Sequence, residues 1–182
     1  MVINIKIGIT GLPGAGKTFT LKRVIDMLTK DSEISVGGMI DEKIVDGRHA
    51  VGIEVTDILT NEKVIFAKPD TDSKIMVGTL GVDLSLFESV AIEAIKVACE
   101  KCDVIVIDEV GKVEVESQAF VDAVKDALDV DKPMIITLHK KSRNPLLQDI
   151  RRRDDVRILE VTPTNRNILP YKIAHLMKGE DS

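Results

Sequence analysis

Residues 11–18 read Gly11-Leu12-Pro13-Gly14-Ala15-Gly16-Lys17-Thr18, and this stretch decides the fold. Its glycines permit backbone conformations that are closed to other residues, so consecutive N–H groups can turn inward around a phosphate. Lys17 is placed to reach the β- and γ-phosphates, and the Thr18 hydroxyl is placed to ligate Mg²⁺. An apolar run at residues 3–9 precedes the stretch, and a helix-patterned segment follows it and adds its N-terminus to the site. We therefore predict a nucleoside triphosphate site, because a merely glycine-rich turn would not require both flanking elements.

The composition is that of a globular protein. The chain has 182 residues, of which 44% are hydrophobic and 30% charged, and this predicts a single domain spanning residues 1–182. The net charge of −5 argues against a general binder of nucleic acids or membrane surfaces. No basic and apolar leader precedes the first strand, and the richest apolar stretch, residues 87–102, carries charges such as Glu93 and Lys96. We expect a cytoplasmic protein with neither a membrane partner nor an obligate protein partner.

Strand-like and helix-like patterns alternate along the chain. This alternation predicts an α/β fold with a mostly parallel sheet and helices on both faces. An antiparallel β-meander is predicted as an insert at about residues 34–68, and the polar, glycine-punctuated segment 69–82 is expected to be a loop. The strand-like runs of the meander lie at residues 34–44, 50–55 and 63–67, with turn signals at Asp46-Gly47 and Thr60-Asn61-Glu62.

The second half of the chain continues the alternation. Ser85 and Glu88 form a capping box that predicts the start of a long amphipathic helix. Residues 104–107, Val-Ile-Val-Ile, are typical of a fully buried central strand. The remaining predicted elements are a helix from about Ser117, a strand at 133–138, a short helix opened by Asn144-Pro145, a strand at 156–161 and a helix at 167–177.

Cys99 and Cys102 form a C-x-x-C pair at the end of the predicted long helix. Such a pair is compatible with zinc or redox chemistry. A zinc site would need two more ligands, and the sequence has no second cysteine pair and no closely spaced histidine pair. We interpret both residues as core or surface thiols.

The predicted central strand ends in Asp108-Glu109. Acidic residues at the carboxyl end of a buried strand usually lie in the ligand crevice of an open α/β sheet. Asp108 is predicted to hold Mg²⁺ through a water beside Thr18, and Glu109 to orient the attacking water or accept its proton. The alternative is an Asp-Glu pair that caps a turn. The sequence lacks the Asn-Lys-x-Asp segment of guanine-reading GTPases, so the pair favours the ATPase branch in which a glutamate polarises water.

That branch has a further strand between the loop strand and the acidic strand, with a polar residue at its tip that can sense the γ-phosphate. Residues 133–138 are the candidate strand, and Thr137 and His139 lie at its end. His139 is the candidate sensor, and the alternative is a surface histidine next to Lys140 and Lys141.

Phosphoryl transfer also requires positive charge at the transferring phosphate. Arginines crowd the C-terminal third of the chain. We prefer Arg166, because it lies in the loop after a strand's carboxyl end, where the ligand crevice is expected. Most of the run Arg151-Arg152-Arg153 is interpreted as a solvated face interrupted by Asp154 and Asp155, and RNA binding by this basic patch is the alternative.

Together these motifs resemble the THEP-type nucleoside-triphosphatase family, which includes the cancer-related nucleoside-triphosphatase homologues. The resemblance implies a RecA-like sheet and slow, Mg²⁺-dependent hydrolysis of nucleoside triphosphates to diphosphates with broad base tolerance. It implies that Lys17, Thr18, Asp108 and Glu109 carry the function. It also places Gly111 and Lys112 in a second nucleotide-binding segment. It covers nearly the whole chain and rests on residues 11–18, Ile107-Asp108-Glu109-Val110-Gly111-Lys112-Val113-Glu114, Gly81-Val82-Asp83, Thr137-Leu138-His139-Lys140, Asn144-Pro145-Leu146, and Glu160-Val161-Thr162-Pro163-Thr164-Asn165-Arg166.

Two positions depart from the family's pattern. Glu42-Lys43-Ile44 stands where relatives commonly carry a Glu-Val-Arg-like segment, and Leu80 stands in place of a frequent tyrosine. Lys43 and Arg48 are the candidate substitutes for the missing arginine.

Two other functions stay open on the sequence alone. The first is a nucleotide or small-molecule kinase, for which the segment 69–82 would be the lid over a second substrate. The second is a nucleotide-gated adapter or RNA-binding module that uses the basic patch.

Overall fold

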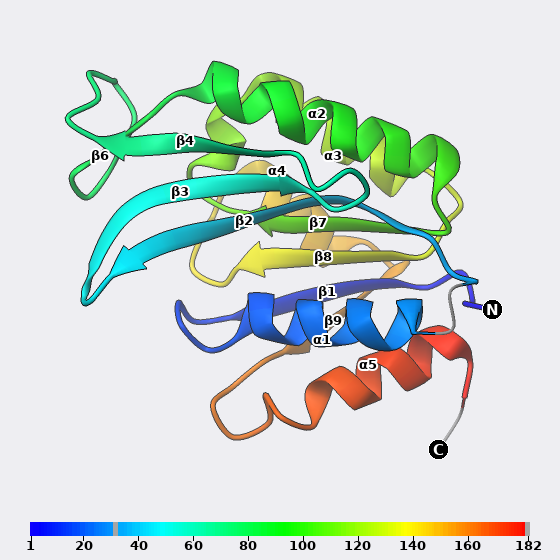
Figure 1. The fold of residues 1–182 in the computed structure, drawn as a ribbon. Helices are drawn as coiled ribbons and strands as arrows, with labels where there is room; N and C mark the ends of the chain where they lie inside the picture. The colour runs from blue at the N-terminus through cyan, green and yellow to red at the C-terminus, as the bar shows by residue number, and fades with distance from the viewer. Residues whose placement is uncertain (31–32, 181–182) are drawn as a thin grey trace.

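The computed structural model describes residues 1–30 and 33–180, and a single nine-stranded sheet runs through it (Figure 1). The order of the strands across the sheet is β5-β6-β4-β3-β2-β7-β8-β1-β9. In chain order the strands are β1 (Lys6–Gly11), β2 (Val36–Asp46), β3 (His49–Asp57), β4 (Lys63–Pro69), β5 (Met76–Val77), β6 (Leu80–Val82), β7 (Val104–Val110), β8 (Met134–His139) and β9 (Val156–Glu160).

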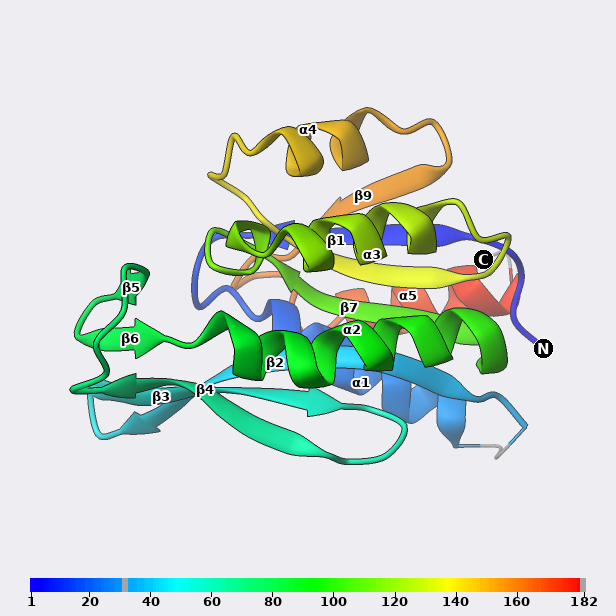
Figure 2. The ribbon, with the colours of Figure 1, turned by 90° about the horizontal axis from the view of Figure 1, so that it is seen from above.

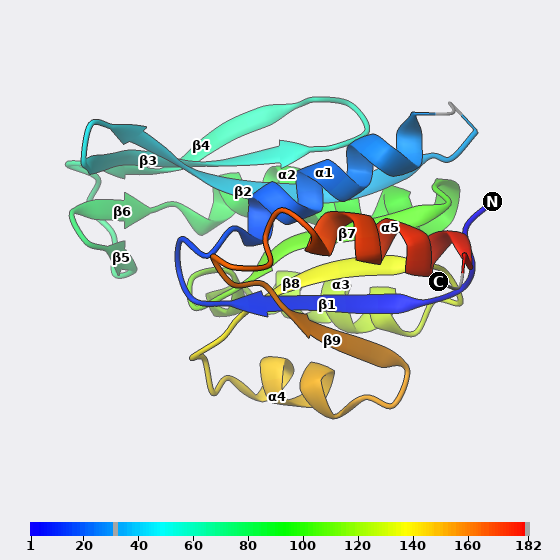
Figure 3. The same ribbon diagram turned by 90° about the horizontal axis from the view of Figure 1, so that it is seen from below.

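Helices cover both faces of this sheet, as predicted. α2, α3 and α4 lie on one face (Figure 2), and α1 and α5 lie on the other (Figure 3). Each face has its own apolar core, and β7 contributes to both because its side chains alternate between the two faces. Among the described residues, no helix has the length and apolar character needed to cross a membrane. The helices are α1 (Lys17–Thr29), α2 (Leu84–Lys101), the 3₁₀ turn η1 (Glu114–Glu116), α3 (Gln118–Leu128), α4 (Pro145–Arg152) and α5 (Leu169–Lys178).

The parallel part of the sheet is the part that positions the functional site. β2, β7, β8, β1 and β9 run parallel to one another, so their carboxyl ends meet at one edge. β8 lies between β1 and β7, which confirms the predicted strand between the loop strand and the acidic strand. Residues 104–107 are fully buried, as expected for a strand covered on both faces.

The predicted β-meander is present, but it is continuous with the main sheet. Residues 36–40 of β2 pair in parallel with β7, and its later residues continue into an antiparallel hairpin with β3. Gly38 permits the close approach of β2 and β7, because a Cβ built there would lie 1.8 Å from the carbonyl oxygen of Val106. Its φ of +121° also lies in the region that favours glycine. β2 therefore joins the meander directly to the nucleotide half of the sheet.

Segment 69–82 is not simply a loop, so that prediction was wrong in part. β6 pairs antiparallel with β4, with Lys68 opposite Gly81, and β5 pairs with β6 to form the edge of the sheet. Strands of two and three residues are too short to carry an alternating pattern. They form because β4 offers the unpaired backbone groups of an edge strand.

The predicted capping box of α2 was also wrong. The N-cap is Asp83, whose side chain accepts a hydrogen bond from the backbone N–H of Leu86 at 3.2 Å. Glu88 instead accepts a hydrogen bond of 2.7 Å from the hydroxyl of Ser117, the N-cap residue of α3. The spacing of Ser85 and Glu88 matches a capping box, but the carboxylate of Glu88 accepts its hydrogen bond from α3 and so links α2 to α3. Cys99 and Cys102 are free thiols at the end of α2, as interpreted from the sequence.

Candidate nucleotide-binding site

The loop between β1 and α1 has the backbone conformation that its glycines predict. Gly14 and Gly16 adopt φ values of +79° and +111°, which other residues rarely adopt. The N–H of Ala15 donates to the carbonyl oxygen of Leu12 at 3.0 Å and closes the turn. Because α1 begins at Lys17, the loop presents the N–H groups of a helix N-terminus to the same space. This arrangement can bind a phosphate.

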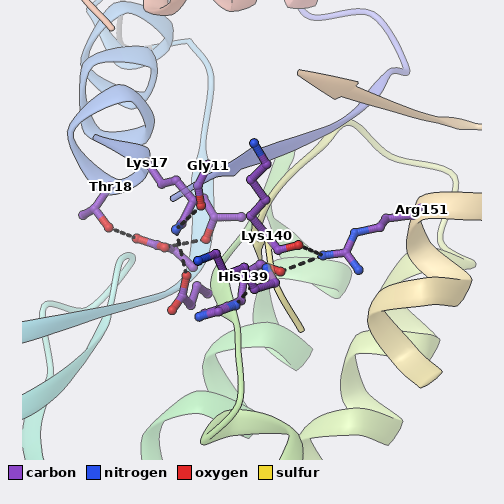
Figure 4. A network of polar contacts seen from close by, with 10 residues as sticks. Gly11, Lys17, Thr18, His139, Lys140 and Arg151 are labelled. Atoms are coloured by element: carbon purple, nitrogen blue, oxygen red, sulfur yellow. Dashed lines mark hydrogen bonds and ion pairs between the residues drawn. The ribbon is translucent and has the colours of Figure 1, made fainter. Parts of the chain in front are cut away.

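Asp108 is the most deeply placed acidic residue of the site. It is 1% exposed, and its two carboxylate oxygens accept hydrogen bonds from Thr18, at 2.9 Å, and from Thr137 (Figure 4 shows Thr18 and its bond). Burial raises the pKa of this carboxyl to about 7, although the two hydroxyl donors lower it. A cation beside this buried carboxyl group would stabilise its ionised form, because burial otherwise favours the protonated form.

The oxygen donors of Thr18 and Asp108 fit Mg²⁺. Mg²⁺ prefers hard oxygen ligands and usually keeps several waters, binding through one or two protein groups and the substrate phosphates. Within residues 1–30 and 33–180 there is no group of three or more His, Cys, Asp or Glu that would hold a metal ion by itself. One carboxylate and one hydroxyl at the phosphate loop suit a metal that arrives with a nucleotide.

Glu109 and Lys17 face each other across the site. Nζ of Lys17 lies 3.6 Å from Oε2 of Glu109 and donates a hydrogen bond of 3.1 Å to the carbonyl oxygen of Gly11 (Figure 4). The side chain of Lys17 is 10% exposed and that of Glu109 28% exposed, so water reaches the carboxylate more readily than the ammonium. The structure thus brings together the loop lysine and the strand-end glutamate that the sequence selected separately.

His139 ends β8 and lines the same cavity as Glu109. The pKa of its imidazole is lowered, chiefly by burial, although the negative charge of Glu109 acts to raise it. The segment after β8 is fixed by Arg151, whose guanidinium donates to the carbonyl oxygens of His139 at 2.6 Å and Lys140 at 3.3 Å (Figure 4). It also donates to the carbonyl oxygen of Ser142 at 2.8 Å. Arg151 therefore positions the end of β8.

The interpretation of Arg151-Arg152-Arg153 as a solvated face was largely wrong. Arg151 is half-buried against the segment after β8, and Arg153 pairs with Asp155 and Asp129, so only Arg152 is exposed. Internal hydrogen bonds account for two of the three charges, which weakens the case for an RNA-binding patch.

The other predicted site residues occupy different parts of the loop region. Gly111 is buried against the side chain of Glu109, because a Cβ built on Gly111 would lie 3.0 Å from Oε1 of Glu109. Lys112 is exposed and lines the cavity. Arg166 lies over the loop on the β9–α5 side, where its Cδ would be 3.5 Å from a Cβ built on Gly16.

Sequence reasoning missed a pair of carboxyl groups, Asp41 and Glu114. Both carboxylate oxygens of Asp41 are buried and accept no hydrogen bond from any residue that the structure describes. Burial, and next the neighbouring Glu114, raise the pKa of Asp41 well above its usual range, and burial raises the pKa of Glu114 to about 7. The two groups form a hydrogen bond only when one of them holds a proton, because ionised carboxylates are acceptors only.

A sequence signal for Asp41 did exist. Asp41 follows the buried residues of β2, and Ile40 pairs with Asp108 in the parallel register. It therefore lies at the carboxyl edge of the sheet by the same rule that selected Asp108. We did not apply the rule to Asp41, because residues 34–44 were interpreted as part of an inserted meander and not as a strand of the parallel sheet. Glu114 lies in η1, beyond the strand end, and nothing in the spacing marks it as buried.

These groups surround one cavity of about 530 Å³. It begins at the phosphate loop, passes Asp108 and Glu109, and reaches the meander and β5. Its lining residues are Pro13, Gly14, Thr18, Asp41, Glu42, Lys43, Ile53, Phe66, Met76, Val77, Asp108, Glu109, Lys112, Val113, Glu114 and His139.

Comparison with known proteins agrees with this geometry. A family model described as NTPase matches residues 6–174. A protein from Thermoplasma volcanium named "Nucleoside-triphosphatase THEP1" is 42% identical over 177 residues, which cover 97% of this chain and 99% of the relative. The chain belongs to the THEP1 nucleoside-triphosphatase family. A protein of the same name from Thermotoga maritima is 34% identical over 173 residues, which cover 95% of this chain and 95% of that protein.

Solved structures of the family share the fold. The crystal structure of THEP1 from the hyperthermophile Aquifex aeolicus superimposes with a TM-score of 0.85 at 32% identity, over 96% of this chain and 99% of that one. The solution structure of a human cancer-related nucleoside triphosphatase gives a TM-score of 0.80 at 29% identity, over 98% and 100%. The predicted family and the predicted P-loop α/β fold are confirmed.

The two departures from the family's pattern lie in different environments. Leu80 is buried in β6, 1% exposed, and belongs to the core. Lys43 lines the cavity, whereas Arg48 lies at the exposed hairpin between β2 and β3. Of the two candidate substitutes for the missing arginine, Lys43 is the one beside the site.

Proposed function

We propose that this chain hydrolyses nucleoside 5′-triphosphates to the diphosphate and inorganic phosphate, with Mg²⁺ as the cofactor. The observation that carries the proposal is the meeting of three elements in one cavity. Thr18 donates to Asp108, and Glu109 faces Lys17 at 3.6 Å beside a loop whose backbone can bind phosphate. Membership of a family named for nucleoside-triphosphatase activity supports the same reaction.

Lys17 exchanges partners when a triphosphate binds. Without phosphate, its ammonium is held by the Gly11 carbonyl and by Glu109. The phosphate oxygens carry more charge and form stronger, charge-assisted hydrogen bonds. They draw the ammonium away from Glu109, so substrate binding releases the carboxylate for its own task.

Glu109 then orients the attacking water and accepts its proton. The water oxygen bonds to the γ-phosphorus as the bond from that phosphorus to the β–γ bridging oxygen breaks. Lys17 and the loop N–H groups hold the negative charge of the phosphates in place. Thr18 and Asp108 would hold Mg²⁺, which would supply further positive charge to the phosphates.

The residues around the cavity bear on two further properties: which bases the site accepts, and which side chains add positive charge at the phosphates. Phosphate contacts do not distinguish bases, and three of the four phenylalanines are buried in the core, leaving Phe19 and Tyr171 as exposed aromatic rings. We therefore propose broad base tolerance, and we propose slow turnover because the resemblance to the family implies it. Arg166, which lies over Gly16, is proposed to add positive charge to the bound phosphates, and His139 is proposed to sense the γ-phosphate from the end of β8.

The test compares phosphate release from a panel of Mg²⁺-nucleoside triphosphates with binding of a non-hydrolysable ATP analogue. Glu109→Gln should keep or raise the affinity for the analogue, because it frees Lys17, and lower turnover by about 10²- to 10⁴-fold, the usual contribution of a general base. Lys17→Ala should weaken binding itself. Glu62→Gln, in the exposed β3–β4 turn, is the matched control and should behave as the parent. Parent-like turnover in Glu109→Gln would show that the proposed mechanism is wrong.

A further inference from the structure

The cavity beside the phosphate loop extends far beyond the space that a water molecule needs. Its volume is about 530 Å³, whereas one water occupies about 30 Å³ and pockets for organic ligands begin near 300 Å³. Part of this volume receives the γ-phosphate and its metal. The remainder continues past Glu109 to β2, β3, β4 and β5.

The far wall of the cavity is apolar. It is made by Ile53 of β3, Phe66 of β4, and Met76 and Val77 of β5. Phe66 is 2% exposed and Ile53 is 7% exposed, so the core of the sheet fixes both of them. Met76 is 51% exposed, which places the edge hairpin at the mouth. A site that served water alone would gain nothing from such a wall.

One carboxyl group inside the cavity, that of Asp41, has no donor among the described residues, whereas Asp108 and Glu109 are already paired with other residues. Five acidic residues line the cavity against two lysines, and Glu42 is already paired with Lys22. Asp41 faces Glu114, and its two oxygens accept no hydrogen bond from the described part of the chain. The two carboxyl groups can share one proton, but both keep acceptor positions that no described donor fills, so this pair is complementary to a ligand that brings N–H or O–H groups and positive charge.

We propose that this cavity is the site of a second substrate, a small organic molecule that carries an ammonium group and a hydroxyl on an apolar stem, and that the chain transfers the γ-phosphoryl group to that hydroxyl. The ammonium would lie at Asp41 and Glu114, the stem would lie on the wall formed by Ile53 and Phe66, and the hydroxyl would lie at Glu109. The proposal rests on the proposed function, because it uses the same bound triphosphate.

The transfer step is the hydrolytic step with a different nucleophile. The hydroxyl oxygen forms a bond to the γ-phosphorus, and the bond from that phosphorus to the β–γ bridging oxygen breaks. The hydroxyl proton passes to the carboxylate of Glu109, and the products are a phosphate monoester and a nucleoside diphosphate. Water reacts in the same way when no acceptor is bound, so hydrolysis is the reaction of the empty acceptor site.

The experiment uses three six-carbon probes that differ only in the end group opposite the hydroxyl: 6-amino-1-hexanol, 1-hexanol and 6-hydroxyhexanoate. Their binding is measured by ligand-observed NMR with Mg²⁺ and a non-hydrolysable ATP analogue, and phosphorylated product is followed by ³¹P NMR with ATP. We expect 6-amino-1-hexanol to bind at least tenfold more tightly than the other two and to form a phosphate ester.

The variant that tests the carboxylate pair is Asp41→Asn combined with Glu114→Gln, which keeps the shape of both side chains. It should abolish the preference for the amine and leave the binding of 1-hexanol unchanged. Asp46→Asn, at the exposed end of the same strand, is the matched control and should keep the preference. Thermal unfolding of each variant confirms that it is folded.

Three results would overturn the proposal: equal binding of the three probes, an unchanged preference in the double variant, or inorganic phosphate as the sole product with every probe. Hydrolysis without an acceptor is measured in parallel. If that hydrolysis is absent, the proposed function fails. If it is present and independent of the probes, only the acceptor site fails.

Discussion

Replacing the buried carboxyl of Glu114 by an amide should change how the stability of the protein depends on pH. Burial raises the pKa of Glu114 from 4.5 to about 7, with Glu109 adding to the effect. Between these two pH values the folded chain binds a proton at this group and the unfolded chain does not. The free energy of unfolding therefore falls as pH rises through this window, and it levels off with respect to Glu114 above it.

The magnitude follows from the two pKa values. Each pH unit between them is worth about 1.4 kcal/mol, so keeping Glu114 ionised in the folded state costs about 3 kcal/mol. Glu114→Gln is close in shape to the protonated acid and cannot ionise. It should match the parent near pH 4 and be more stable by about 3 kcal/mol near pH 8. The loss of Glu114 also makes ionisation of Asp41 easier, which acts in the same direction.

The assay is urea unfolding of the parent and the variant at intervals from pH 4 to pH 8. Groups common to both proteins that do not interact with Glu114, such as Asp155, cancel in the difference. Glu116→Gln lies in the same η1 turn with an exposed side chain and should stay within about 0.5 kcal/mol of the parent throughout. A stability difference between Glu114→Gln and the parent that does not vary with pH would refute the reasoning.

Three further changes test the fold and the site. Gly38→Ala would place a Cβ 1.8 Å from a carbonyl oxygen of β7 and should cost more than about 4 kcal/mol in thermal unfolding, whereas Gly47→Ala, with open space around it, should cost about 1 kcal/mol. Thr137→Val removes a hydrogen bond to the buried carboxylate of Asp108 and should lower Mg²⁺-dependent phosphate release by about tenfold or more; unchanged release would separate Thr137 from the site. Asp83→Ala removes the cap of α2 and should lower the free energy of unfolding by about 1 kcal/mol in urea, and no change would show that the cap is replaced by solvent.

The phosphate loop and the acidic strand end were predictable because each follows from local chemistry. Glycines with positive φ, a lysine and a hydroxyl in an eight-residue stretch specify a phosphate cradle wherever the chain folds. Residues 104–107 specify a buried strand, and the polar residues after it must lie at the sheet edge. The place of β8 between β1 and β7 was predicted differently, from the ATPase branch that the Asp108-Glu109 pair favours, and the strand order confirms it.

The errors have one physical cause, which is competition between partners distant in sequence. Glu88 had the spacing of a capping box but accepts a hydrogen bond from Ser117 of another helix. Arg151 had the surroundings of a surface arginine but binds three carbonyl groups after β8. β5 and β6 carry no periodic signal and form because β4 is an edge strand. Local patterns do not report such contacts.

The sequence by itself determined that the site can hold a phosphate. The reason is that eight consecutive residues, 11–18, specify the geometry of the phosphate loop, whatever the rest of the fold. Only the tertiary structure decided what surrounds that loop. It placed Lys17 beside Glu109, joined β2 to β7 so that Asp41 meets Glu114, and closed a cavity with the apolar residues of the meander. These groups come from segments far apart in the chain. Their burial and charge arise only when the strands pair, because desolvation and contact between side chains are properties of the packed sheet.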